Sequence, residues 1–352
     1  MLSFRDLDRR FGQTPAPIGR LLSDIDVARG REMAFRLQHP EVLKALIEIA
    51  LVQSVEASNA IENITAPLKR IEQLVEEKTT PRNRSEEEIA GYRSVLNAIH
   101  SSAPHIPLRP RVIEQLHRDL YRFSATRGGK FKGADNTVEE VLPDGTHRIR
   151  FQPVGWLETP AAVDELCTGF SNARDSDAYN PLLLIAAFTL DFLVIHPFSD
   201  GNGRMSRLLT LLLLYQSEIE VGRFISIEKL IEGTKESYYQ SLEASTAGWH
   251  EGRHDLEPWT RYFLGVVLAA YRRFEERSGV LVAVRGAKAE MVKNFIRSSL
   301  SDTFRVQDVR QAVPSASDVY IRQLLRQLKS EGVLEQVGKG QHAGWRRLHN
   351  DF

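Results

Sequence analysis

Residues 180–215 read NPLLLIAAFTLDFLVIHPFSDGNGRMSRLLTLLLLY, and this stretch predicts two apolar helices joined by a polar loop. The Asn-Pro pair at its start is typical of a helix N-terminus, and the apolar run after it predicts a helix that extends to Val194. Pro197 ends this helix, because proline lacks a backbone N–H and clashes with the preceding turn. The next apolar run predicts a second helix over residues 205–215.

Apolar residues recur at helical spacing over most of the remaining chain, which predicts a mainly α fold. Ser85 and the three glutamates after it form a capping-box pattern, which predicts a helix running towards His100. Two β-prone stretches, 137–142 and 146–151, flank a Pro-Asp-Gly turn at 143–145 and predict an exposed hairpin. Further helices are predicted over residues 41–62, 67–78 and 111–123, from about residue 160, over 227–245 and over 257–276.

The composition is ordinary for a soluble globular protein of 352 residues, with 42% hydrophobic and 26% charged residues. Because the 46 basic and 46 acidic residues cancel, a basic nucleic-acid coat over the whole surface is excluded, although a local patch is not. The single cysteine, Cys167, excludes an internal disulfide framework. The N-terminal residues contain no apolar leader, and the longest apolar run, 208–215, is too short to span a bilayer. We therefore expect a cytoplasmic protein with no membrane partner.

The C-terminal tail differs from the rest in charge. Residues 285–352 contain 12 Lys or Arg and 7 Asp or Glu, a net charge of +5. Helices predicted over 287–300, 306–312 and 317–331, followed by a β-prone segment with its tip at 338–340, give the outline of a winged helix. The predicted domains are an N-terminal helical region at 1–107, a core at 108–265, a linker helix at 266–284 and a winged helix at 285–352.

The loop between the two apolar helices has the properties of an anion site. Gly201 and Gly203 permit tight turns, so that successive N–H groups can face inward at the start of the second helix. These N–H groups and the helix dipole both favour a bound anion. Asn202 adds a side-chain donor.

Four side chains in the same segment point to phosphate chemistry. Arg204 and Arg207 are three residues apart on the second helix, so that they can face one way and bind a polyphosphate. Asp200 supplies a carboxylate for Mg²⁺, which commonly binds one or two carboxylates together with phosphates. His196 is the group in this loop that can take a proton near neutral pH.

The segment HPFSDGNGRMSR resembles the complete signature of the Fic family, HPFx(D/E)GNGRxxR, and the likeness extends over roughly residues 108–265. The resemblance implies a Fic-type helical core with a β-hairpin flap. Fic proteins typically transfer AMP from ATP to a hydroxyl side chain of a target protein. ATP, Mg²⁺ and an unidentified protein target are therefore the implied substrate, cofactor and partner.

The resemblance also implies roles for the loop residues. His196 would deprotonate the target hydroxyl, and Asp200 would bind Mg²⁺. Phe198, although assigned to this loop, is expected to anchor it in the core. In the implied nucleotide-binding set, Gly201, Asn202 and Gly203 hold the α- and β-phosphates, Arg204 the β-phosphate and Arg207 the γ-phosphate, and Tyr238 and Tyr239 contact the base. The other members of this set are Phe198, Ser199 and Asp200.

The predicted hairpin resembles the Fic flap, which pairs with an extended segment of the target by strand addition. Its start is formed by Asn136, Thr137 and Val138. Downstream of the tyrosine pair, this chain has Thr246 where the family often has asparagine, so that the adenine contact departs from the family pattern.

An upstream motif, Ser58-Asn-Ala-Ile-Glu62-Asn63, matches the inhibitory pattern (S/T)xxxE(G/N) of Fic proteins. Glu62 is predicted to pair with Arg207, the arginine that the γ-phosphate requires. Ser58, one turn earlier, would help to hold the inhibitory helix in place. The transferase is thus expected to be autoinhibited.

Two other functions stay open. The first is a DNA-binding regulator with a Fic-type sensing core, because Arg322, Arg326 and Lys329 have helical spacing on the third helix of the tail. The second is a Fic transferase that uses another nucleotide donor or mainly removes AMP. A homodimer is common among Fic proteins of this arrangement and also stays open.

Overall fold

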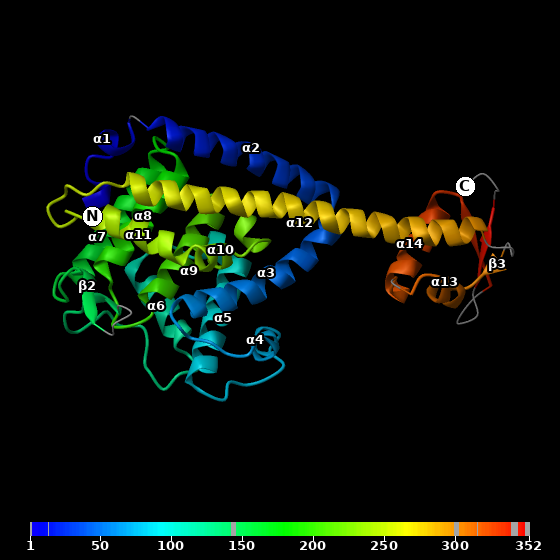
Figure 1. Ribbon diagram of the computed structural model, residues 1–352, viewed down its shortest axis with the longest axis horizontal. Helices are drawn as coiled ribbons and strands as arrows, with labels where there is room; N and C mark the ends of the chain where they lie inside the picture. The colour runs from blue at the N-terminus through cyan, green and yellow to red at the C-terminus, as the bar shows by residue number, and fades with distance from the viewer. Residues whose placement is uncertain are drawn as a thin grey trace. The chain divides into compact units, whose positions relative to one another are not determined.

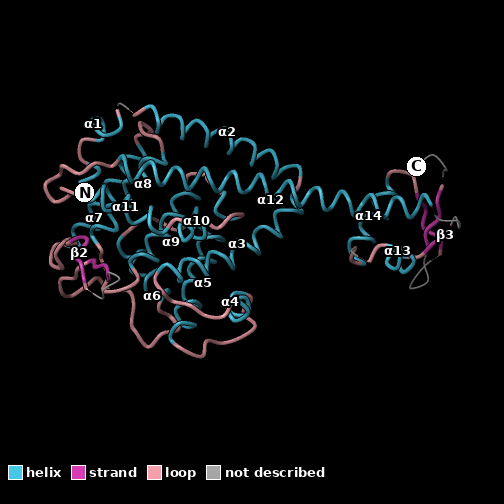
Figure 2. The backbone as a smooth tube through the Cα atoms, in the orientation of Figure 1, coloured by secondary structure: helices cyan, strands magenta, loops and turns pink. Residues whose placement is uncertain are grey.

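The computed structural model describes residues 2–12, 14–141, 146–298, 303–314, 316–338 and 344–348. Contacts divide the chain into two compact units, Met1–Glu275 and Glu276–Phe352. Figures 1 and 2 show that helices dominate and that the strands form two small antiparallel sheets, which confirms the predicted mainly α fold with a β-hairpin. Among the described residues, no helix combines the length and apolar composition needed to cross a bilayer.

The core of the first unit is the predicted pair of apolar helices. In α8 (Pro181–Ile195), 13 of 15 residues are buried, so this helix is enclosed on all sides. The side chain of Asn180 caps it by accepting a hydrogen bond from the N–H of Leu182. The second helix, α9 (Asn202–Gln216), is buried almost as fully and packs on α8. Burial of both helices holds the loop between them against the core.

The other helices of the first unit surround this pair, and the two longest, α2 and α12, lie side by side (Figure 1). The α2 helix was not predicted from the sequence. The remaining α-helices are α1 (Leu7–Phe11), α2 (Ala16–Gln38), α3 (Pro40–Ile61), α4 (Leu68–Val75), α5 (Arg84–Ser102), α6 (Pro110–Leu120), α7 (Thr159–Asp175), α10 (Ile227–Gly233), α11 (Lys235–Thr246) and α12 (Glu257–Ser298), and single turns of 3₁₀ helix lie at Leu2–Phe4, Ala103–His105 and Val221–Arg223.

Three predicted helix limits were wrong. The α5 helix is capped by Asn83, whose side chain accepts from the N–H of Glu86, and not by Ser85. The helix predicted over 227–245 is two helices, which break at Thr234. The two predicted helices 257–276 and 287–300 are one continuous α12, because no residue between them stops it.

The hairpin lies where it was predicted, with β1 (Val138–Val141) antiparallel to β2 (His147–Phe151). Its Pro-Asp-Gly tip, 143–145, lies outside the described residues. A register shift between Val138 and Glu139 marks a bulge at the start of β1.

The second unit contains the end of α12, α13 (Val306–Ala312), α14 (Asp318–Ser330) and a three-stranded sheet in the order β3-β5-β4. The strands are β3 (Thr303–Phe304), β4 (Leu334–Val337) and β5 (Gly344–Arg347). Its core includes Ile321, Leu325 and Trp345. The wing tip at 339–340 lies outside the described residues, and the winged-helix assignment and the four predicted domain limits stay predictions.

A buried polar cluster attaches the N-terminus to α8. Asp191, which is fully buried, accepts hydrogen bonds from the hydroxyl of Ser3 at 2.5 Å, the backbone N–H of Ser3 at 3.1 Å and the indole N–H of Trp249 at 2.7 Å. The Ser3 hydroxyl also lies 2.9 Å from Nε2 of His254. Burial raises the pKa of Asp191 to about 6, although these hydrogen bonds oppose the rise.

The raised pKa of Asp191 predicts a pH-dependent stability. A carboxyl group whose pKa is higher in the folded than in the unfolded state contributes most below its unfolded pKa and loses that contribution as the pH rises through about 6. The rise of the Asp191 pKa from its ordinary value of 3.8 to about 6 corresponds to about 3 kcal/mol of unfolding free energy. When the pH rises from 4 to 7, the wild type should therefore lose about 3 kcal/mol of unfolding free energy that Asp191→Asn does not lose. Urea unfolding at the two pH values measures this difference.

The exposed Asp175, at the end of α7, provides the control Asp175→Asn. The free energy of unfolding of this control should change with pH in the same way as that of the wild type. A pH-independent difference between Asp191→Asn and the wild type would contradict the prediction.

Candidate active site

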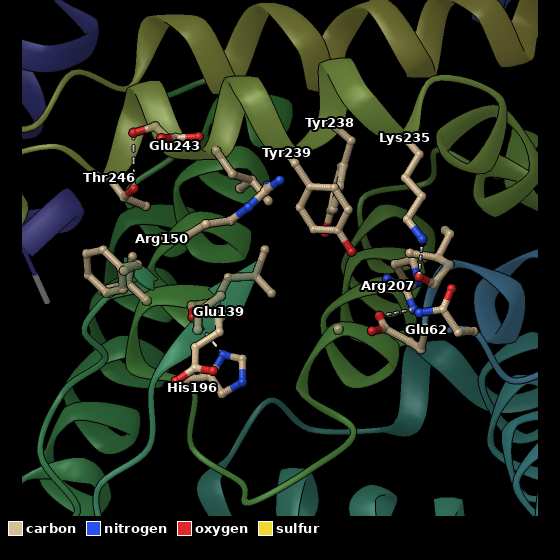
Figure 3. A pocket seen from close by; sticks show the side chains of 18 residues that line it. Glu62, Glu139, Arg150, His196, Arg207, Lys235, Tyr238, Tyr239, Glu243 and Thr246 are labelled. Carbon is tan, nitrogen blue, oxygen red and sulfur yellow. Dashed lines mark hydrogen bonds and ion pairs between the residues drawn. The ribbon is translucent and has the colours of Figure 1, made fainter. Parts of the chain in front are cut away.

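An open pocket of about 510 Å³ lies between the hairpin, α11 and the start of α9. Figure 3 shows Glu62 with Arg207 on one side of the pocket, His196 on another, and Arg150 and Tyr239 reaching towards its middle. Of the predicted site residues, Glu62, Val138, His196, Gly203, Arg207, Tyr238 and Tyr239 line it. Residues far apart in the sequence thus share one cavity.

The polar loop is held in shape by its own asparagine. Asn202 is buried, its side-chain oxygen accepts from the N–H of Phe198 at 2.9 Å, and its amide donates to the carbonyl of Phe198 at 2.7 Å. The Asn202 side chain therefore binds within the loop, and its role as a donor to phosphate stays a prediction. Gly201 has φ of 79°, in the left-handed region, where a Cβ would also meet the Tyr121 ring.

A histidine that the sequence analysis missed fixes the other side of this loop. His117 Nδ1 accepts from the N–H of Gly129 at 2.8 Å, so Nε2 carries the proton and donates to the carbonyl of Asp200 at 3.0 Å. Burial lowers the pKa of His117 to about 4, which keeps this neutral form. Its ring stacks on Phe198 with centroids 3.7 Å apart.

Phe198 is completely buried, as expected for an anchor, and it does not line the pocket. Ser199 is exposed and also lies outside the pocket lining. Their assignment to the nucleotide-binding set is not supported by this geometry, because neither side chain faces the cavity.

His196 ends α8 in the left-handed conformation, with φ of 50°. Its Nδ1 lies 3.3 Å from the carbonyl of Leu193, which can only accept, so the proton is assigned to Nδ1 and Nε2 is left as the acceptor. The pKa of His196 is lowered to about 4, mainly by burial and in part by nearby Lys132, although the hydrogen bond to Leu193 opposes the shift. The imidazole is therefore neutral at physiological pH and can take a proton.

Arg207 is buried and held by the end of α3. Its Nη2 donates to Oε1 of Glu62 and to the carbonyl of Ser58, and its Nε donates to the hydroxyl of Ser58, each at 2.8 Å. Burial alone would lower the pKa of Arg207, but the carboxylate of Glu62 raises it, and the net direction is upward. The pair predicted from the sequence is thus formed, with Ser58 as a second ligand.

Glu62 also occupies the start of α9. A Cβ on Gly203 would collide with Oε1 of Glu62, so the absence of a side chain at this glycine admits the carboxylate. The N-terminus of a helix attracts anions through its unpaired N–H groups and its dipole. The carboxylate therefore lies where the sequence predicts a phosphate.

Arg204 does not face the pocket. Its side chain is 1% exposed, Nη1 forms an ion pair with Oε2 of Glu88 at 2.7 Å, and Nη2 donates to the hydroxyl of Tyr121 at 2.9 Å. The prediction that Arg204 and Arg207 face one way is wrong, because the buried carboxylate from α5 binds the first of them.

The carboxylate of Asp200 lies at the edge of the loop. Its side chain is 57% exposed, Oδ1 accepts from the N–H of Gly201 at 2.6 Å, and Oδ2 lies 3.8 Å from Nη2 of Arg84. Among the described residues, no group of three His, Cys, Asp or Glu side chains could hold a metal ion by itself. One carboxylate suits Mg²⁺ where a nucleotide's phosphates complete the coordination.

Helix α11 supplies one wall of the pocket. Tyr238 is buried, and Tyr239 stacks under the guanidinium of Arg150, 4.8 Å from the ring centroid. Lys235 donates to the carbonyl of Ile61 at 2.7 Å, beside Glu62. Arg150 and Lys235 were not predicted from the sequence, because single basic residues outside a motif carry no signal of their position.

The predicted flap residues do not all reach the pocket. Val138 lines it, whereas Thr137 donates to Oε1 of Glu139 and Asn136 bonds to Lys132 and to the carbonyl of Phe198. Thr246 lines the pocket at the end of α11.

Residues 107–214 match the model of the Fic/DOC family. The chain is 27% identical over 232 residues to Protein adenylyltransferase Fic of Culex quinquefasciatus, a region that covers 62% of this chain and 41% of that protein. It is 24% identical over 248 residues to Protein adenylyltransferase fic-1 of Caenorhabditis briggsae, which covers 68% and 44%, respectively. The chain thus spans less than half the length of these curated relatives.

Solved structures share the fold. A Fic family protein from Desulfovibrio desulfuricans superposes with a TM-score of 0.63 at 20% identity, covering 96% of this chain and 97% of that one. Fic-1 from Caenorhabditis elegans superposes with a TM-score of 0.58 at 20% identity, covering 76% and 73%.

Proposed function

Because this chain is a Fic family protein with its family match at residues 107–214, we propose that it transfers AMP from ATP to a hydroxyl side chain of a protein. The observation that carries the proposal is the pocket that joins a neutral His196 to Arg207 and the N-terminus of α9. A base, a cation and an anion-binding helix end are the groups that attack at a phosphorus atom requires.

The reaction needs alignment more than covalent help. Nε2 of His196 accepts the proton of the attacking hydroxyl, since Nδ1 is bound to Leu193. The hydroxyl oxygen then bonds to the α-phosphorus, the bond from this phosphorus to the α–β bridging oxygen breaks, and diphosphate leaves. The N–H groups at the start of α9 and the guanidinium of Arg207 bind the phosphates. Tyr238 and Tyr239 form the wall against which the adenine ring of ATP stacks. Strand β1 receives the target segment by strand addition.

Mg²⁺ is the cofactor of the proposed reaction, and Asp200 is the residue that would hold it. The metal supplies charge neutralisation for the phosphates when bound. The single exposed carboxylate of Asp200, close to Gly201, is consistent with this role.

The resting protein is restrained by Glu62, because its carboxylate binds Arg207 and lies at the start of α9. A phosphate at the same position would have to displace the part-buried, charge-assisted hydrogen bond between Glu62 and Arg207. The proposed enzyme is therefore autoinhibited until the end of α3 moves.

Labelled ATP tests the reaction type. The Glu62→Gly protein, incubated with Mg²⁺ and ATP labelled at the α- or the γ-phosphate, should incorporate the α-label alone, and mass spectrometry should find an added AMP. Incorporation of the γ-label would indicate phosphate transfer and would contradict the proposal. A different added nucleotide in a mixed pool, or loss of AMP from a modified target, would favour the alternative activities.

A second candidate function, DNA binding by the second unit, is favoured by the surface of α14. Arg322, Arg326 and Lys329 are exposed on one face, while Ile321 and Leu325 on the opposite face are buried. Exposed cations at this spacing can meet successive phosphates.

Salt-dependent duplex binding by the full-length protein tests this function. If Arg322 and Arg326 each neutralise one phosphate, replacing both by alanine should reduce the slope of log K against log salt by about 2. The control replaces Arg109 and Arg111, two exposed arginines of the first unit, and should leave the slope unchanged. Absence of duplex binding at low salt would instead favour a protein-docking role.

A further inference from the structure

Lys132 is a buried cation that no motif identifies. Lys132 is 4% exposed, and burial lowers the pKa of its ammonium group to about 8. Burial of an ammonium group is costly unless polar groups compensate it. Among the described residues, the ammonium has two such partners, Oδ1 of Asn136 at 2.8 Å and the carbonyl of Ile195 at 3.1 Å.

The bonds of Lys132 lie on both sides of His196. Its ammonium binds the carbonyl of Ile195, the residue before the histidine, and its backbone N–H donates at 2.8 Å to the carbonyl of Pro197, the residue after it. The first carbonyl belongs to the C-terminal end of α8, where a cation is also favoured by the helix dipole.

His196 needs such support because of its backbone. A residue other than glycine adopts the left-handed region less readily, so that contacts from its surroundings help to keep it there. The ammonium and the backbone N–H of one residue, Lys132, bind the two flanking carbonyls, and this holds the direction in which the imidazole projects into the pocket.

The same ammonium reaches the base of the flap. Asn136, which binds Lys132 through its oxygen, donates through its amide to the carbonyl of Phe198 at 3.2 Å and immediately precedes the flap residues 137–138. The segment that would receive the target and the loop that carries the base therefore share one charged partner.

We propose that Lys132 is a positioning residue that holds His196 in its left-handed conformation and connects the base to the flap. The kinetic test of this inference rests on the proposed function, because it measures turnover. The spectroscopic test does not, because it needs no activity. Lys132 contacts neither the pocket nor the nucleotide positions, so its removal should impair turnover and leave nucleotide binding intact.

The kinetic test uses the Glu62→Gly protein as its parent. Lys132→Met keeps the backbone bond and the apolar stem but removes the charge, and it should lower kcat by about 10²-fold, the effect of misplacing a reacting group by about 1 Å. KM for ATP should stay within about twofold, and Lys132→Arg should recover most of kcat. Lys130→Met, an exposed lysine two residues away, is the matched control and should behave as the parent.

The spectroscopic test uses the resting protein with Glu62 intact. The ring signals of His196, identified by their loss in His196→Asn, should move in ¹⁵N-histidine spectra of Lys132→Met and stay in place in Lys130→Met. If the Glu62→Gly parent is inactive, the proposed function fails, and this spectrum still decides the role of Lys132. Unchanged ring signals would overturn the inference, as would turnover of Lys132→Met equal to that of the control.

A folding defect is detected by thermal unfolding. If Lys132→Met is unfolded at the assay temperature, the kcat values of Lys132→Arg and Lys132→Gln are compared instead. The arginine keeps a charged donor, and the glutamine has a neutral one. The inference requires kcat of the arginine variant to exceed that of the glutamine variant by about tenfold or more. Equal values would overturn it.

Discussion

Replacing Glu62 by glycine is expected to raise transfer of AMP to the protein itself by about 10- to 100-fold. The carboxylate forms a 2.8 Å hydrogen bond with Arg207, whose side chain is 4% exposed. A charge-assisted hydrogen bond contributes about 1.5–3 kcal/mol, and each 1.4 kcal/mol corresponds to a factor of ten. Its removal frees both the guanidinium and the start of α9 for phosphates.

Glycine suits the position, because residue 62 caps the C-terminus of α3 and lies outside its helical turns. The measurement is incorporation of α-labelled ATP over time in the presence of Mg²⁺. Glu62→Gln should give intermediate labelling, because an amide can still bind near Arg207 but carries no charge.

Glu77→Gly is a matched control for Glu62→Gly. Glu77 also follows a helix end, has φ of 58°, and forms an ion pair with Arg93 at 2.8 Å, but it does not line the pocket. Its removal should leave labelling at the wild-type level. Equal labelling of the wild type and Glu62→Gly would show that this carboxylate does not restrain the reaction.

Replacing His196 by alanine in the Glu62→Gly protein should lower labelling by about 10²- to 10⁴-fold, the range for loss of a general base. An alcohol hydroxyl is a weak nucleophile until a base takes its proton. ATP affinity, measured by calorimetry, should change little, because in the proposed reaction the phosphates bind to the start of α9 and to Arg207. Persistent transfer in the double variant would exclude the histidine as the base.

His105→Ala provides the control, since this exposed histidine lies in a 3₁₀ turn and does not line the pocket. The pH dependence gives a second check. With the pKa of His196 at about 4 in the resting protein, the base stays unprotonated above that pH, and transfer should fall as the pH decreases through it. Bound triphosphate favours the imidazolium and should move this limit upward.

Much of the fold followed from local patterns. The Asn-Pro start of α8, the apolar runs of α8 and α9 and the turn residues of the hairpin all act over a few residues, and the structure has these elements within about three residues of the predicted limits. The cap of α5 and the continuity of α12 were misjudged, because alternative caps and stops were equally compatible with the local sequence.

The candidate site was predicted less completely. Spacing on a helix placed Arg204 and Arg207 within reach of one ligand, but Glu88 on α5 binds the first and Glu62 at the end of α3 binds the second. Lys132 and His117, which hold the loop through backbone carbonyls, had no motif to mark them.

The sequence by itself determined the helix–loop–helix unit and the chemistry of its loop, because histidine, glycines and arginines there are contiguous and their spacing is set by backbone geometry. Tertiary structure alone decided which side chains share the pocket and which are buried in ion pairs elsewhere. The physical reason is that burial and counter-charges come from helices distant in the chain, and these contacts determine the direction in which each charged side chain points.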